Sequence, residues 1–322
     1  MLLALALAVL SLGLTAPPAQ AVGSSVILRS LVVSDGGFAS EAMRAALDRA
    51  LIPYTLVDLS DGGRPTIDAD FLEDQGAAQG RFQAVFLPNQ AGGGLSQAEL
   101  DALAAYEAEY GFRQVNGYDA PQASLGLTLV DSGTFDGLPI TVAAAGHAGP
   151  FSYLRSDAQI TIDDIDPNPL NLETFGYVAA PLDPMPAGQS FTPLLEVTFD
   201  GVTGPVVREF THDGREEMVI TASPNQQFLW CNTNAQGFVS WATRGINLGH
   251  QRNYFNVHID DVFLPDSRWS VDDNCTPGED CIDPTVTTPD ILMTAGDVTR
   301  LTGWQAASGT RLDIVFNAYG TT

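Results

Sequence analysis

The sequence predicts an α/β plus β protein, and three patterns in its 322 residues support that class. Buried strands and amphipathic helices alternate from 26 to 117, which is typical of a parallel, doubly wound sheet. From 120 to 205, short alternating runs are separated by glycine and proline, which is typical of a small β-sandwich. Strand and helix patterns return from 206 to 248 and continue from 249 to 322. We therefore expect an α/β domain interrupted by a β-rich insertion, followed by a further α/β region.

Two helices define the first α/β segment. In "GFASEAMRAALDRALI", Ser40 is the expected N-cap, and apolar residues recur at helical spacing along one face. In "LSQAELDALAAYEAEYG", Ser96 and Glu99 have the spacing of a capping box, and Gly111 ends the helix. The strands predicted between these helices complete the alternation.

The segments 22–119 and 206–248 are expected to form one domain, because "REEMVITAS" again predicts a strand and "FVSWATRGINLG" a helix. This domain resembles the flavodoxin-like and class I glutamine amidotransferase-like folds. No cysteine lies at a strand-to-helix turn of its first segment, 26–117, so the nucleophile of amidotransferase chemistry is missing there and a scaffold role is expected. The insertion, 120–205, is a possible carbohydrate-binding module. Four of its aromatic residues either form a sugar-stacking surface or pack in the core: Phe151, Tyr153, Phe175 and Tyr177.

The chain is strongly acidic, with a formal net charge of −25, and all 14 of its basic residues are arginines. This charge argues against binding to nucleic acid and against docking on anionic lipid. It is compatible with a cationic or neutral partner, including an amino-sugar polymer. The alternative is that the acidic surface only keeps the protein soluble.

The first 21 residues resemble a signal peptide in their pattern. An apolar run is followed by prolines and by the small-x-small sequence Ala19-Gln20-Ala21. No positively charged residue precedes the apolar run. A clipped N-terminus or a wrongly assigned start would explain this. We expect export, a mature chain from about Val22 without a membrane span, and a secreted or cell-surface location.

Three cysteines remain for the exported chain. Cys275 and Cys281 close the short loop "CTPGEDC" and are expected to form a disulfide in an oxidising compartment. Cys231 is expected to be a buried free thiol. A zinc knuckle is the alternative, but the cysteine spacing does not favour it.

The stretch "RNYFNVHIDDVFLPDSRW" carries the candidate chemistry. It begins like a buried strand and then places His258, Asp260 and Asp261 within four residues. Aspartate and histidine are ligands for zinc and similar divalent ions, and a hydrolytic site also needs a base for the attacking water. Because neighbouring side chains of a regular strand point to opposite faces, the two aspartates converge only if the strand curls or bulges at its end.

The longer string "GHQRNYFNVHIDDVFLPDSRW", with "RLDIVFNAYG" after the cysteine loop, resembles the galactosaminogalactan-type polysaccharide deacetylases, which are related to the NodB-homology enzymes. The resemblance implies that 249–322 is the N-terminal part of a (β/α) deacetylase barrel. It also implies that Asp260 is the general base and Asp261 a ligand of a divalent metal, usually zinc. The implied reaction is hydrolysis of N-acetyl groups on an amino-sugar polysaccharide.

The chain departs from that family in its histidines. The family holds its metal with one aspartate and two histidines, but no histidine follows His258. A barrel needs roughly 200 residues or more, which is far longer than 249–322. We therefore expect the remaining ligands to lie beyond residue 322, and this chain to be inactive by itself.

Four further residues have open roles. His258 either supports the site or packs, with direct metal ligation a third possibility. Arg252 pairs with an aspartate, contacts the sugar, or forms a structural ion pair. Trp269 stacks on a sugar ring or packs in the core, and Asn317 is a candidate for orienting the site. His147 and His212 are expected in surface loops.

Two other functions compete with the deacetylase. The first is a secreted carbohydrate-binding or cell-surface module, in which "HIDD" is an acidic turn. The second is a calcium-binding adhesive protein, but "DSRWSVDDN" lacks the alternation and glycine of a calcium loop.

Overall fold

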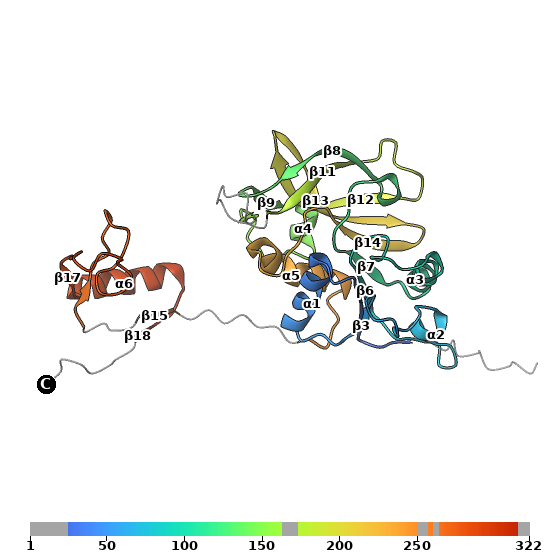
Figure 1. Cartoon of the computed structure of the whole chain (residues 1–322), viewed down its shortest axis with the longest axis horizontal. Helices are drawn as coiled ribbons and strands as arrows, with labels where there is room; N and C mark the ends of the chain where they lie inside the picture. Colours follow the sequence, from blue (N-terminus) through green and yellow to red (C-terminus); the bar gives the residue numbers. More distant parts are fainter. Residues whose placement is uncertain (1–24, 163–172, 250–256, 260–263, 315–322) are drawn as a thin grey trace, which may run out of the picture. The chain divides into compact units, whose positions relative to one another are not determined.

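A computed structural model of the chain describes residues 25–162, 173–249, 257–259 and 264–314 (Figure 1). The chain divides into two compact units, Met1–Gln251 and Arg252–Thr322, which are described separately here. The expected signal segment lies outside the described residues. Within them, no helix combines the length and the apolar character that a bilayer span requires.

The first unit is built on a nine-stranded sheet with the order β10-β9-β12-β13-β14-β7-β6-β2-β3. The last five strands of this order run parallel to one another, and the first four continue the sheet by antiparallel pairing. The strands are β2 (Ser30–Ser34), β3 (Tyr54–Asp58), β6 (Ala84–Leu87), β7 (Arg113–Asn116), β9 (Pro139–Val142), β10 (Gln159–Thr161), β12 (Ser190–Phe199), β13 (Val202–His212) and β14 (Arg215–Ile220).

The β-rich segment 120–205 was expected to form its own sandwich, and the structure does not confirm a separate one. Its strands β9, β10 and β12 join the same sheet as the parallel strands. A two-stranded sheet of β8 (Leu127–Thr134) and β11 (Phe175–Pro181) contacts β13. The difference arises because an alternating strand pattern does not specify its pairing partner.

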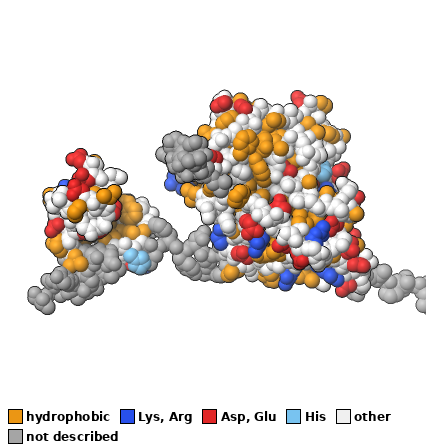
Figure 2. All heavy atoms as spheres, in the orientation of Figure 1, with side chains coloured by type: hydrophobic (Ala, Val, Ile, Leu, Met, Phe, Trp, Pro, Cys, Tyr) orange, Lys and Arg blue, Asp and Glu red, His pale blue; other side chains and the backbone are white. Residues whose placement is uncertain are grey.

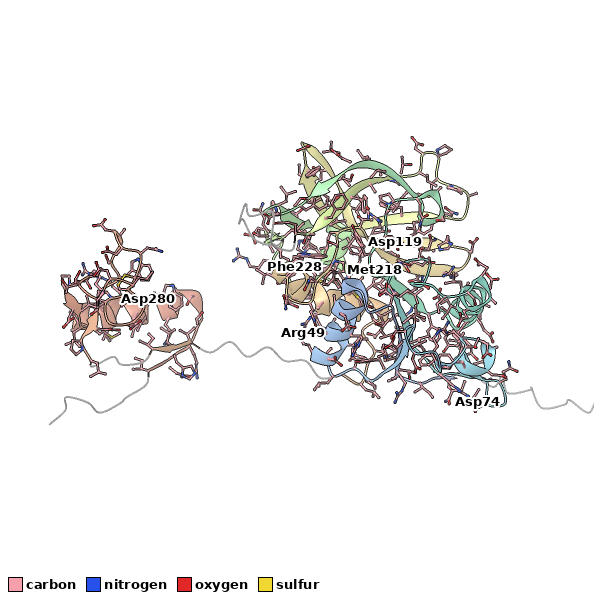
Figure 3. The ribbon with its side chains drawn as sticks, viewed as in Figure 1. Arg49, Asp74, Asp119, Met218, Phe228 and Asp280 are labelled. Atoms are coloured by element: carbon pink, nitrogen blue, oxygen red, sulfur yellow. A yellow bond between two sulfur atoms is a disulfide. The ribbon has the colours of Figure 1, made fainter. Side chains whose placement is uncertain are left out.

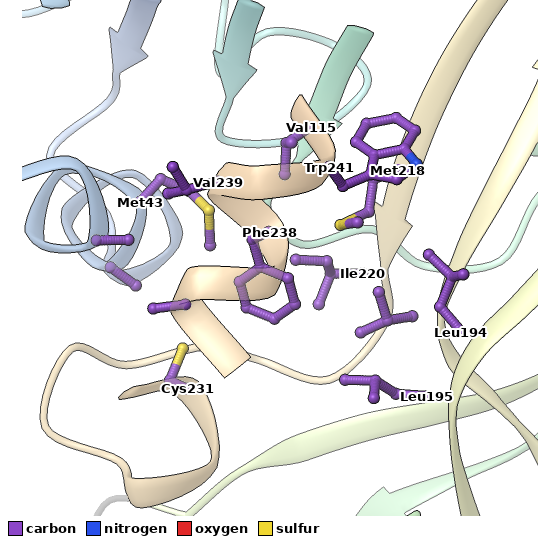
Figure 4. Close-up of a cluster of buried hydrophobic side chains, with 14 of the residues drawn as sticks. Met43, Val115, Leu194, Leu195, Met218, Ile220, Cys231, Phe238, Val239 and Trp241 are labelled. Atoms are coloured by element: carbon purple, nitrogen blue, oxygen red, sulfur yellow. The ribbon is translucent and has the colours of Figure 1, made fainter. Parts of the chain in front are cut away.

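The two faces of the parallel strands are covered by different helices. Val32 of β2 belongs to the core that includes α1 (Phe38–Arg49) and α5 (Leu229–Ala242), while its neighbours Leu31 and Val33 pack in the core that includes α3 (Gln97–Tyr110). Figure 4 shows the first core, where Met43, Phe238 and Trp241 gather between helices and sheet. A strand buried on both faces is the expected centre of a doubly wound sheet.

The helix ends test the capping predictions. Ser96 and Glu99 form the predicted capping box of α3, and Gly111 ends it in the left-handed conformation. Ser40 is not the cap of α1, because that helix starts after Gly37 and the Ser40 hydroxyl lies within the first turn. The predicted helix at "FVSWATRGINLG" is α5, which begins earlier, at Leu229, and ends at Ala242.

The remaining elements of the first unit are short. A three-stranded sheet is formed by β1 (Ser25–Val26), β4 (Glu73–Asp74) and β5 (Gln79–Gly80). Two short helices and one 3-10 turn complete it: α2 (Ala69–Leu72), α4 (Ala144–Ala148) and η1 (Ala123–Leu125).

The second unit contains two small pairs of strands and one helix. β15 (Val257–Ile259) pairs in parallel with β18 (Leu312–Ile314), and β16 (Asp266–Ser267) pairs antiparallel with β17 (Asp290–Ile291). The helix α6 (Ala295–Ser308) begins at Thr294, which forms a capping box with Asp297. The described residues of this unit contain no closed barrel, so the predicted barrel start is represented by one strand–helix–strand unit.

Candidate functional site

The predicted motif begins on β15. Ile259, its last residue, lies opposite Ile314 of β18, and because the two strands are parallel their carboxyl ends lie at the same edge. Functional residues of parallel sheets gather at such edges. Four predicted site residues lie outside the described residues, and their positions remain predictions: Arg252, Asp260, Asp261 and Asn317.

A cavity of about 690 Å³ lies beside the end of β15. Ile259 lines it together with residues from the β16–β17 pair and from the start of α6. The charged residues that line it are one arginine and three aspartates: Arg268, Asp266, Asp290 and Asp297. Half of the lining residues are apolar, so the cavity is acidic and offers a ligand both apolar surface and hydrogen-bonding groups.

Asp297 has a structural role within this cavity. Its carboxylate accepts hydrogen bonds from the backbone N–H and the hydroxyl of Thr294, at 3.0 and 2.6 Å. The hydroxyl bond, followed by the backbone bond, lowers the pKa of Asp297. Asp297 is therefore committed to starting α6, while Asp266 and Asp290 remain as candidate ligand contacts.

His258 and Trp269 are both accessible. The His258 side chain is exposed on β15, in register with Asp313 of β18. Trp269 is 46% exposed, so it is not a core residue. It does not line the cavity, although its neighbour Arg268 does. Among the described residues, no hydrogen bond or ion pair of either side chain fixes one of its predicted roles.

Only one group of described residues has the spacing of a metal site, and its chemistry does not fit one. Ligand atoms of Cys275, Asp280 and Cys281 lie within 4.8 Å of one another (Asp280 is labelled in Figure 3). The two cysteines form the predicted disulfide, however, so they offer no thiolate to a metal. The expected metal therefore depends on Asp261 and on ligands outside the described residues. Cys231 is free and buried, as predicted.

A buried ionic network in the first unit was missed by the sequence analysis. Arg215 contacts Glu107 at 2.7 Å and Glu217 at 2.8 Å, and Asn116 donates to Glu217 at 2.8 Å. Burial raises the pKa of Glu107 to about 7, although Arg215 opposes the shift. Burial also favours the neutral form of Glu217. The hydrogen bond to His212 and the positive charge of Arg215 outweigh the effect of burial, so the pKa of Glu217 is lowered.

His212 belongs to this network and is not in a surface loop as predicted. It is the last residue of β13, only 8% exposed, and its Nε2 lies 2.9 Å from Glu217 Oε1. Its ring stacks on Phe210 with centroids 4.5 Å apart. The sequence signal was the period-two spacing of Arg215, Glu217 and Val219, which places both charged residues on one face of β14. His147 lies in the short helix α4, and it is partly buried.

The described residues define a mixed α/β protein with several sheets. This fold is similar to that of Agd3, described as a novel carbohydrate deacetylase, with a TM-score of 0.66 and 18% sequence identity. The match covers 90% of this chain and 42% of that chain, so this chain spans less than half of the Agd3 chain.

Two β-galactosidase structures are also similar, at a level that supports no argument. The enzyme from Rahnella sp. R3 matches at a TM-score of 0.41 and 11% identity, over 68% of this chain and 31% of its own. The enzyme from Bacillus circulans sp. alkalophilus matches at a TM-score of 0.42 and 10% identity. That match covers 70% of this chain and 32% of the enzyme chain. The sequence matches no family model and no curated protein.

Proposed function

We propose that the protein removes N-acetyl groups from an amino-sugar polysaccharide and that this chain carries the first part of its catalytic site. The observation that carries the proposal is the position of His258 and Ile259, the first two residues of the "HIDD" motif. Its strand β15 ends at the carboxyl edge of a parallel pair, beside an acidic cavity of about 690 Å³. The similarity of fold to a carbohydrate deacetylase supports the same activity.

Each residue of the motif has a proposed task. Asp260 accepts the proton of the attacking water as general base. Asp261 would hold a divalent metal, for which zinc is the expected ion, and the metal would polarise the amide carbonyl. His258 would orient one of these aspartates from the exposed face of β15, while Arg252, Trp269 and Asn317 would contact the sugar.

The proposed location is outside the cell or at its surface. The Cys275–Cys281 disulfide supports it, because structural disulfides persist mainly in oxidising compartments. Polysaccharides of cell envelopes and extracellular matrices would be accessible to the protein there.

The test is acetate release by the natural protein from an N-acetylated amino-sugar polymer. We expect Asp260→Asn and Asp261→Ala to lower the rate by about 100-fold or more, because a positioned general base contributes roughly 10²–10⁴-fold. Asp272→Asn is the matched control, since Asp272 is an exposed carboxylate that does not line the cavity. Equal rates in the wild type and both motif variants would refute the assignment.

A further inference from the structure

We propose that the first unit binds an amino-sugar chain bearing free amino groups, in a groove at the carboxyl edge of its parallel sheet. The groove consists of two cavities of about 220 and 720 Å³ that share Asn89 and Tyr118 in their linings. We call it the carboxyl-edge groove. All of its lining residues belong to the first unit.

The sheet topology places this groove where ligands of α/β proteins usually bind. The chain runs from β2 to β3 on one side and then to β6 on the other, so the strand order reverses between β2 and β6. Crevices outside the carboxyl ends of strands at such a reversal are the usual ligand sites of open α/β sheets. Residues just after four parallel strands line the groove: Asp35 after β2, Asn89 after β6, Tyr118 after β7 and Ser223 after β14.

Aromatic rings form one part of the groove and its surroundings. Phe38 lines it and is 62% exposed, although the large apolar residues Met43 and Leu47 of the same helix are buried. The ring of Tyr118 lies 6.0 Å from that of Tyr177, which in turn lies 5.3 Å from the 41% exposed Phe175. Large exposed rings beside a cavity are a typical feature of ligand sites, because they offer flat apolar faces to a ligand.

Carboxylates dominate the charge of the larger cavity. Asp101, Asp119 and Glu217 line it, against the single cation of Arg215, and Asp35 adds a further carboxylate to the smaller cavity. Arg215 and Glu217 are already paired with each other, and Arg215 also with Glu107, so the carboxylates left to attract a ligand are Asp35, Asp101 and Asp119. The groove therefore favours a cation.

Asp119, which is labelled in Figure 3, is a buried carboxylate whose position is fixed by the backbone. It is only 6% exposed, and its two oxygens lie 3.1 and 3.0 Å from the backbone nitrogen of Gln90, which donates to them. The same cavity is also lined by three residues with amide side chains, Asn89, Gln90 and Gln122. Fixed carboxylates with neighbouring amides suit a ligand that presents both an ammonium group and hydroxyl groups.

These three properties together identify an amino sugar as the occupant. An aromatic face matches a pyranose ring, amides match its hydroxyl groups, and carboxylates match a free ammonium but not an N-acetyl group. The choice of ligand rests on the proposed function, because deacetylation produces such amines. The groove would then hold sections of polymer that have already been deacetylated.

Calorimetric titration of the full chain, carrying Asp260→Asn to prevent turnover, tests the groove. The probes are a short glucosamine oligosaccharide and its N-acetylated counterpart. We expect the free amine to bind at least about tenfold more tightly, since a hydrogen bond to a charged group contributes about 1.5–3 kcal/mol. The preference should decrease as salt is added, because the groove is open to solvent.

Two groove variants and two controls locate the binding. Asp101→Asn and Phe38→Ala should each weaken binding of the amine by about fivefold or more, and both residues are exposed, so folding is not at risk. The controls are Asp70→Asn, at an exposed carboxylate, and Leu229→Ala, at an apolar residue that is 63% exposed. Neither residue lines the groove, so both variants should leave binding unchanged.

Equal affinity for the two oligosaccharides, or unchanged binding in both groove variants, would overturn the proposal. Acetate release by the natural protein is measured in parallel. Acetate release without amine binding counts against the groove alone. Amine binding without acetate release counts against the proposed function alone.

Discussion

Arg64 donates two hydrogen bonds to the carboxylate of Glu99, at 2.6 and 3.1 Å. The same carboxylate accepts from the backbone N–H of Ile67 and from the N–H and hydroxyl of Ser96, at 3.2, 2.9 and 2.9 Å. Glu99 is 3% exposed. One buried side chain thus completes the capping box of α3 and also fixes the preceding loop to that helix.

This arrangement predicts a loss of stability in acid that depends on Glu99. Chiefly through Arg64, the pKa of Glu99 is lowered from 4.5 to about 2. A lowered carboxyl pKa stabilises the folded state above about pH 4.5, and the contribution disappears as the pH falls from there to about 2. At neutral pH it corresponds to about 3 kcal/mol. Denaturant unfolding of the wild type and of Glu99→Gln across this range measures the effect.

Glu109→Gln provides the matched control, because Glu109 is exposed on the same helix. We expect its unfolding free energy to follow the wild type at every pH. The Glu99→Gln curve should be flatter between about pH 2 and 4.5 and should meet the wild-type curve in strong acid. A parallel offset at all pH values would contradict the assigned role of the charge.

His212 and Glu217 predict an opposite dependence at higher pH. The bond to Glu217 is the main cause that raises the pKa of His212 above 6.5. A raised histidine pKa stabilises the fold below about pH 6.5, and the contribution is lost as the pH rises through the folded-state value. We expect His212→Gln to remove this decline. Glu107 also makes the fold less stable as the pH rises, because burial raises its pKa to about 7. The quantity to measure is therefore the difference in unfolding free energy between wild type and His212→Gln at each pH.

The pKa of His212 can also be followed directly by NMR titration of its ring protons. Glu217→Gln should bring that pKa down, because the charged partner is replaced by a neutral one. An unchanged His212 pKa in this variant would show that the 2.9 Å contact does not control its titration.

The parts of the fold that were predicted correctly depend on local chemistry. The ends of α3 follow from Ser96, Glu99 and Gly111, whose interactions lie within a few residues of one another. The disulfide also follows from a short spacing, between Cys275 and Cys281. These signals need no knowledge of the rest of the chain.

The parts that were missed depend on distant partners. The burial of His212 depends on a network that also includes Glu107 of the distant helix α3. From the sequence alone, a polar residue before an Asp-Gly turn resembled a surface residue. The start of α5 was missed because "LWCNTNAQG" contains weak helix formers, and the burial of Trp230 and Phe238 overrides their propensity.

The candidate site was predicted from a motif, and only part of it has a described position. Ile259 and the cavity beside it agree with a site at the carboxyl end of β15. The roles of Asp260 and Asp261 still rest on the resemblance. The carboxyl-edge groove could not be foreseen, because its lining combines residues that follow four strands with residues of α3 and β14, which are far apart in the sequence.

Gly237 provides a last prediction, about how α5 holds the β-rich segment. It lies in α5, and a Cβ there would overlap the ring of Phe151, which is fully buried and meets Phe238 edge to face at 5.9 Å. Phe151 is therefore a core residue and not the sugar-stacking residue that was one of its predicted roles. We expect Gly237→Ala to destabilise the first unit by about 1–3 kcal/mol, because overpacking outweighs the better helix propensity of alanine.

Gly303→Ala is the matched control in α6. A Cβ at Gly303 meets no described atom within 4 Å, so alanine should stabilise that helix by about 0.5–1 kcal/mol. Hydrogen exchange of the α5 and α6 amides measures the two effects separately, since the glycines belong to different units. Faster exchange in α5 with slower exchange in α6 is the expected pair of results. Slower exchange in α5 of Gly237→Ala would mean that Phe151 can move aside, and that this contact does not fix the β-rich segment to the helix.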